Sequence, residues 1–174
     1  MSVLVLGIGN VLMKDDSIGV RAVDELQRRF RFSDDVEILD GGTSGIELLS
    51  YICNRDCMII VDAVKSGLKP GTVVRVEGED VPAKFMTRIS PHQLGLSDLL
   101  AAATLTGELP REMVLFGIEP KLIELGFEVS EEVEAGFERL IEVIVEELRR
   151  VGCAVNSVEP PSGRKSIWEN VTLD

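Results

Sequence analysis

Short, continuous apolar runs alternate along the chain with longer segments in which apolar residues recur every three to four positions. The runs predict strands that are buried on both faces, and the recurring positions predict helices with one apolar side. The expected strands are residues 3–8, 36–39, 58–61, 73–76 and 113–118. The expected helices are residues 18–30, 46–52, 94–105 and 133–148.

This alternation predicts an α/β fold, a three-layer α/β/α sandwich around a twisted, mostly parallel sheet of about five strands. The turn residues of 65–71 indicate a hairpin that leads into the fourth strand, which makes one strand antiparallel. The periodicity stops near Gly152, so residues 1–152 are expected to form a single domain. Residues 153–174 are polar and hold Trp168, and we expect them to be a mobile C-terminal tail.

Composition narrows the functional classes. The 174 residues carry a net charge of −12 and only 5% aromatic side chains, which argues against nucleic acid as a partner. No segment has the roughly 20 uncharged apolar residues of a membrane span, and no basic targeting segment precedes the first strand. Three cysteines without metal or disulfide spacing are assigned no chemistry. The chain is therefore expected to be cytoplasmic and not to bind membranes, and its single compact domain makes a monomer the expected state.

Candidate chemistry follows the expected strands. In an open α/β sheet, ligands bind at the carboxyl ends of the strands. Asp16 follows the first strand, Asp40 the second and Asp62 the third. Each aspartate alone is most simply a helix cap or a turn former. Asp62, however, directly ends a buried run, where a carboxylate needs a cation, a donor or a raised pKa.

His92 is the single histidine of the chain and lies before an expected helix. If it meets Asp16 and Asp62, one imidazole and two carboxylates form a site suited to a divalent transition metal. A dinucleotide fingerprint after the first strand is disfavoured, because Leu12 occupies the place of its third glycine. Motifs of P-loop proteins, serine hydrolases and helical zinc peptidases are missing from the sequence.

Several blocks together resemble the hydrogenase maturation endopeptidases, in the order of that family and across about the first 150 residues. The blocks are LVLGIGN at 4–10, DDSIGV at 15–20, ILDGGT at 38–43, IVDA at 60–63, SPHQLG at 90–95 and FGIEP at 116–120. The resemblance implies an enzyme that trims the C-terminus of the nickel-iron hydrogenase large-subunit precursor after nickel insertion. Its metal-contacting positions fall on Asp16, Asp62 and His92.

The resemblance also implies that nickel is carried by the substrate and serves as the recognition element, and other divalent transition metals can substitute for it. Family classification is of the aspartic type, with Asp16 and Asp62 among the catalytic candidates. Asp40 lies in a block that the family associates with cleavage, and we interpret it as a candidate base that activates water. The residues do not settle which group activates the water.

Two other functions remain open from the sequence. The chain could bind the same precursor as a nickel-dependent docking or chaperone module without cutting it, although the intact block around Asp40 argues against this. The third hypothesis is a small-molecule enzyme that binds a dinucleotide. The aspartate-rich first loop disfavours it, because carboxylates repel a pyrophosphate.

Overall fold

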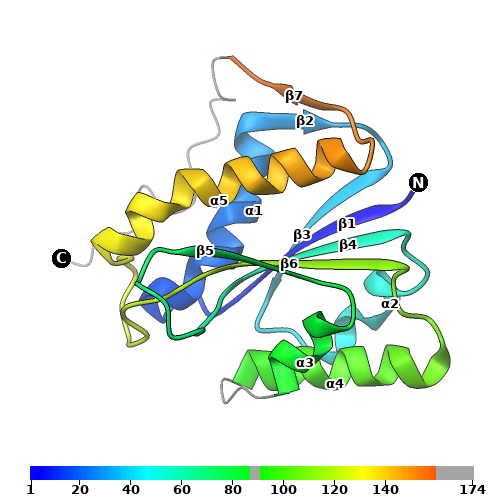
Figure 1. The fold of residues 1–174 in the computed structure, drawn as a ribbon, viewed down its shortest axis with the longest axis horizontal. Helices are drawn as coiled ribbons and strands as arrows, with labels where there is room; N and C mark the ends of the chain where they lie inside the picture. Colours follow the sequence, from blue (N-terminus) through cyan, green and yellow to red (C-terminus); the bar gives the residue numbers. More distant parts are fainter. Residues whose placement is uncertain (87–90, 160–174) are drawn as a thin grey trace.

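The computed structural model describes residues 1–86 and 91–159. A five-stranded sheet forms its centre (Figure 1). The strands of this sheet are β1 (Val3–Ile8), β3 (Val36–Gly42), β4 (Cys57–Ala63), β5 (Val73–Glu77) and β6 (Glu112–Ile118). Their order is β3-β1-β4-β6-β5, and all neighbouring pairs are parallel except β5 with β6. The mostly parallel sheet is thus confirmed.

Helices cover both faces of this sheet. They are η1 (Lys14–Ser17), α1 (Ile18–Arg29), η2 (Ile46–Leu48), α2 (Leu49–Ile52), α3 (Asp80–Met86), α4 (Pro91–Thr106) and α5 (Glu131–Arg150). Figure 1 shows α1 and α5 on one face and α2, α3 and α4 on the other. The expected three-layer sandwich is therefore the observed one.

Two apolar clusters hold the layers together, one on each face of the sheet. Alternate residues of a strand point to opposite faces, so Val3 and Val5 of β1 pack under α1 and α5. Leu4 and Leu6 pack on the side of α2 and α4. All residues of β1 and β4 are buried, as the continuous apolar runs predict for central parallel strands.

The predicted hairpin into the fourth strand is wrong. β5 is antiparallel, but it pairs with β6, which lies between β5 and β4. The reason is burial. Six of the seven residues of β6 are buried, whereas β5 is half exposed, so β6 takes the interior position and β5 the edge.

A second, two-stranded sheet was not predicted. β2 (Phe30–Phe32) pairs antiparallel with β7 (Val155–Ser157). Residues 155–157, which we expected in the tail, form a strand because Cys153 and Val155 are buried against the core under α5. Residues 160–174, with Trp168, lie outside the described residues. Within the described parts of the chain, no helix combines the length and the apolar character needed to cross a membrane.

Candidate active site at the carboxyl edge of the sheet

The first candidate, Asp16, is pressed against the ends of β1 and β4. A Cβ atom on Gly19 would lie 2.2 Å from the carbonyl oxygen of Val61, and one on Gly9 would lie 1.9 Å from that of Asp16. Only glycine permits these approaches of backbone to backbone. Asp16 is buried, and its Oδ2 accepts a hydrogen bond of 3.0 Å from the backbone N–H of Asn10. The loop therefore fixes Asp16 over the strand that carries Asp62.

The second candidate, Asp62, is completely buried near the end of β4. Its Oδ2 accepts a hydrogen bond of 3.0 Å from Nε2 of Gln93, which also lies 3.4 Å from the carbonyl oxygen of Ala63. Gln93 is itself buried in the first turn of α4. This is the donor that a carboxylate at the end of a buried strand requires. The sequence shows Gln93 beside His92 but gives no sign of this contact.

Asp40 has different surroundings. It lies near the end of β3, the strand at one edge of the sheet, and is exposed. Its Oδ1 accepts a hydrogen bond of 2.9 Å from the backbone N–H of Gly42. Partial burial raises the pKa of Asp40, the Gly42 N–H acts to lower it, and the negative charge of Asp24 on α1 adds to the rise. The structure thus places Asp40 beside α1, whereas Asp62 contacts α4.

The third predicted ligand, His92, belongs to the first turn of α4, and its side chain lies outside the described residues. This turn is held close to the loop after β3, because the Cα of Gly95 would lie 3.1 Å from a Cβ on Gly45. The described residues contain no cluster of three or more potential metal ligands. The grouping of His92 with Asp16 and Asp62 therefore stays a prediction.

A neighbouring aspartate has a structural role that the sequence did not reveal. Asp15 is buried and accepts hydrogen bonds from the backbone N–H groups of Lys121, Leu122 and Ser130, at 2.9, 2.8 and 2.6 Å. The hydroxyl of Ser130, the N-cap of α5, donates a fourth at 2.9 Å. Asp15 therefore ties the segment between β6 and α5 to the loop that carries Asp16.

Glu119 is a further buried carboxylate at this edge of the sheet. Its Oε2 accepts a hydrogen bond of 2.6 Å from the backbone N–H of Ser66. The carbonyl oxygen of Glu119 also accepts a hydrogen bond of 2.8 Å from the backbone N–H of Gly71. Glu119 thus holds the loop between β4 and β5 at the end of β6.

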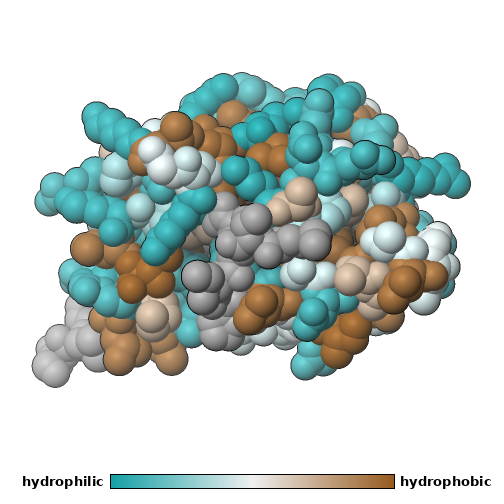
Figure 2. All heavy atoms as spheres, turned by 60° about the horizontal axis from the view of Figure 1, so that its bottom comes forward, coloured by the Kyte–Doolittle hydropathy of each residue, from teal (hydrophilic) through white to brown (hydrophobic). Residues whose placement is uncertain are grey.

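Exposed apolar side chains surround the site. They lie on the segments that follow β1, β3, β4 and β6 and on the first turn of α4: Leu12, Ile46, Leu68, Leu94, Ile123 and Leu125. Figure 2 shows apolar groups at its left, the end at which the loops after β4 and β6 lie in Figure 1. Apolar groups gathered at the rim of a site are typical of surfaces that bind another protein.

Comparison with known proteins gives consistent results. The family model of hydrogenase maturation proteases matches residues 20–147. The hydrogenase 2 maturation protease of Escherichia coli (strain K12) is 47% identical over 153 residues, which cover 87% of this chain and 93% of that protein.

Solved structures agree with this assignment. The hydrogenase maturating endopeptidase HybD from E. coli superposes with a TM-score of 0.88 at 45% identity, covering 91% of this chain and 99% of that one. The [NiFe] hydrogenase maturation protease HybD from Thermococcus kodakarensis gives a TM-score of 0.67 at 33% identity, covering 84% and 99%. The sequence blocks, the fold and these relatives together show that the chain belongs to the hydrogenase maturation protease family.

Proposed function

We propose that this protein is an endopeptidase that removes the C-terminal peptide of the nickel-iron hydrogenase large-subunit precursor after nickel insertion. It would act in the cytoplasm, as a monomer. The observation that carries the proposal is the pair of buried carboxylates, Asp16 and Asp62, held at the same edge of the sheet by tight backbone packing and by Gln93. His92 lies in the first turn of α4, immediately before Gln93.

In this proposal nickel belongs to the substrate and serves as its recognition element. Asp16, Asp62 and His92 would complete the coordination of the nickel, and other divalent transition metals could take its place. Two carboxylates and one imidazole suit such ions. Because a precursor without metal cannot form these bonds, the enzyme would discriminate against it by the binding energy that they supply. The same bonds would hold the scissile peptide at a fixed position.

Water activation would fall to a carboxylate, in keeping with an aspartic type of peptidase. Asp40 is the candidate general base, supported by its exposure and by its raised pKa, which brings a carboxylate closer to the working pH of a base. Asp16 and Asp62 are the alternatives. The rim of exposed apolar side chains supports a protein substrate rather than a small molecule.

The test is a mass-resolved cleavage assay with nickel-loaded and nickel-free precursor. We expect wild-type protein to release a C-terminal peptide from the loaded precursor only, and the His92→Ala variant to release none. Asp34→Asn serves as a control, because Asp34 is an exposed aspartate at the amino end of β3, the end of the strand opposite to Asp40. It should cleave at the wild-type rate.

Two results would contradict the proposal. Cleavage of both precursors at equal rates would remove nickel as the recognition element. Binding of the loaded precursor without release of a peptide would instead support the docking or chaperone module, and Asp40 would lose its assigned role.

A further inference from the structure

β5 is the last strand of the sheet on the side of β6. Two backbone hydrogen bonds mark the ends of its ladder with β6. The N–H of Glu119 donates to the carbonyl oxygen of Thr72 at 2.9 Å, and the N–H of Gly78 donates to that of Met113 at 2.9 Å. Both bonds join residues that lie directly opposite each other in the register of the two strands.

Hydrogen-bonded pairs alternate with pairs that are not hydrogen-bonded in an antiparallel ladder. Val74 and Val76 therefore direct their backbone groups toward β6. Val73, Arg75 and Glu77 direct their N–H and C=O groups away from the sheet. A row of backbone donors and acceptors at an edge is a template for another strand.

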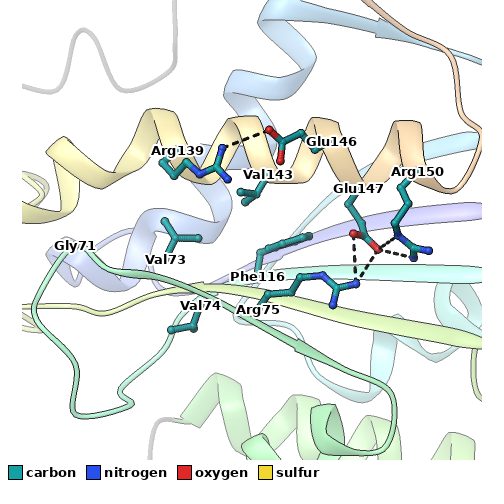
Figure 3. A pocket seen from close by; sticks show the side chains of 10 residues that line it. All are labelled: Gly71, Val73, Val74, Arg75, Phe116, Arg139, Val143, Glu146, Glu147 and Arg150. Atoms are coloured by element: carbon teal, nitrogen blue, oxygen red, sulfur yellow. Dashed lines mark hydrogen bonds and ion pairs between the residues drawn. The ribbon is translucent and has the colours of Figure 1, made fainter.

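A hollow of about 640 Å³ lies between β5 and α5. Figure 3 shows Val73 and Val143 pointing toward each other across it, with the ring of Phe116 beside Val143. The guanidinium of Arg75 lies 6.0 Å from the centre of that ring. The hollow therefore has an apolar part formed by valines and Phe116, and charged side chains of both signs border it.

Arg75 is held in this place by the buried carboxylate of Glu147. Its Nη2 donates to Oε1 of Glu147 at 3.2 Å, and Nη2 of Arg150 donates to the same oxygen at 2.7 Å. Burial acts to raise the pKa of Glu147, but the bonds from both arginines outweigh it, so the pKa lies below its ordinary value. The border of the hollow is thus fixed before any partner binds, which lowers the entropy cost of binding.

A second hollow, of about 630 Å³, lies between β5 and α3, the helix on the other side of the sheet from α5, and Arg75 lines both hollows. Val76 and Glu77 of β5 line it together with Asp80, Ala83 and Lys84 of α3. Successive side chains of a strand point to opposite faces. A strand added to β5 would therefore direct its side chains alternately toward the two hollows, the arrangement by which β-strand addition gains both affinity and specificity.

We propose that an extended segment of the precursor polypeptide adds to β5 as a sixth strand and places alternate side chains in these two hollows. The inference rests on the proposed function for the identity of the partner. The segment of the precursor that would add to β5 is the one that follows the scissile bond. β5 begins at the carboxyl edge of the sheet, since Val73 pairs with Ile118 and Ile118 with Ala63, the neighbour of Asp62. A chain that leaves the site toward its C-terminus therefore runs parallel to β5.

The distance from the site fits this occupant, and charge argues against a second copy of the chain. The added strand would lie three strand spacings from β4, roughly 14 Å, which about five extended residues can span. A second copy of this chain is disfavoured, because each copy carries a net charge of −12 and the two would repel. The hollows themselves have equal numbers of cationic and acidic side chains: Arg75, Lys84, Arg139 and Arg150 with Glu77, Asp80, Glu146 and Glu147.

The first experiment replaces the outward N–H of Glu77. Glu77→Pro removes this N–H and places a ring there, while Val76 and Gly78 keep their bonds to β6. Proline is tolerated where the N–H of an edge strand faces outward. Glu77→Ala is the matched variant, because it removes the same side chain and keeps the N–H. With nickel-loaded precursor we expect kcat/KM of Glu77→Pro to be at least about tenfold below that of Glu77→Ala, mainly through KM.

The second experiment measures amide hydrogen exchange of the wild type with and without loaded precursor. We expect the outward amides of Arg75 and Glu77 to slow by at least about tenfold on binding. The inward amides of Val74 and Val76 are the internal control, because β6 already protects them. If Glu77→Pro does not fold, Ala83→Phe fills the hollow at α3 without changing β5, and it should lower kcat/KM in the same way.

The outcomes separate this inference from the proposed function. Protection of Arg75 and Glu77 without cleavage would contradict the proposed cleavage and support strand addition. Cleavage with equal kcat/KM for the two Glu77 variants and no protection would overturn strand addition and leave the proposed function standing. A wild-type dimer that Glu77→Pro converts to a monomer would also overturn it, because a second copy would then occupy β5.

Discussion

β4 and β3 both carry an aspartate near their carboxyl ends, but the two carboxylates have opposite surroundings. Asp62 on β4 is completely buried and accepts a hydrogen bond from Gln93. Asp40 on β3 is exposed and bonds only to the N–H of Gly42 among the described hydrogen bonds of its side chain. The position of the strand explains the difference, since β4 is central and β3 is at the edge. The same residue type after an apolar run thus becomes either a fixed group or an accessible one.

Removing the charge of the buried aspartate on β4 is expected to have the largest effect. Asp62→Asn keeps the shape of the side chain and an oxygen that can accept from Gln93, but it removes the negative charge that a metal ligand supplies. We expect kcat/KM on nickel-loaded precursor to fall by about a thousandfold, equivalent to about 4 kcal/mol of transition-state stabilisation. Steady-state cleavage kinetics measure the loss, and thermal unfolding should show a fold retained within a few degrees. A variant that cleaves at the wild-type rate would remove Asp62 from the site.

A smaller effect is expected when the contact of Asp62 is removed and its charge is kept. Gln93→Leu leaves the buried carboxylate without the amide donor at 3.0 Å. We expect the free energy of unfolding to fall by about 1–3 kcal/mol, and kcat/KM to fall by about 10- to 100-fold, as for residues that orient a ligand. Urea unfolding and cleavage kinetics give the two values.

Gln27 offers a matched control for this change. Its Nε2 donates to the carbonyl oxygen of Ile38 at 3.1 Å, but at the exposed surface. Gln27→Leu should change the free energy of unfolding by less than about 0.5 kcal/mol and leave cleavage unchanged. Equal losses of stability for the two variants would show that burial does not increase the contribution of the Gln93 contact to the free energy of unfolding.

The sequence predicts the parts of this fold that periodicity controls. The apolar runs of β1, β4 and β6 and the apolar face of α5 give strands and helix close to their observed bounds. Periodicity does not say which strands are neighbours, so the predicted hairpin of β5 was wrong once the more apolar β6 took the interior position. β2 and β7 have three residues each, too few to show a period.

The sequence also predicts only part of the candidate site. A strand followed by aspartate predicts that Asp16, Asp40 and Asp62 share one edge of the sheet, which the structure confirms. Nothing local distinguishes Asp15 from Asp16, although Asp15 is bound by Ser130, 115 positions away. Gln93 was missed for the same reason, because its partner on β4 is distant in the sequence. Contacts of this kind are set by tertiary packing and leave no local pattern.

The smallest effect concerns Asp40 and depends on pH. Because burial, and further the charge of Asp24, raise the pKa of Asp40 in the folded state, the folded protein holds the proton more tightly than the unfolded chain does. Ionising Asp40 therefore lowers the free energy of unfolding. This loss is absent below the ordinary aspartate pKa of about 4 and complete above the raised pKa of the folded protein. Asp40→Asn removes this cost and keeps an oxygen for the Gly42 N–H.

We expect Asp40→Asn to match the wild type in free energy of unfolding at a pH below about 4. As the pH rises through the raised pKa, the variant should become more stable, by less than about 0.5 kcal/mol because solvent screens an exposed carboxylate. Urea unfolding of both proteins across this range measures the difference. In an Asp24→Asn background the difference should shrink, since Asp24 contributes to the rise. If the variant instead becomes less stable than the wild type as the pH rises, the stability difference has the opposite sign. Ionised Asp40 would then be stabilised by the fold, as a buried and paired carboxylate is.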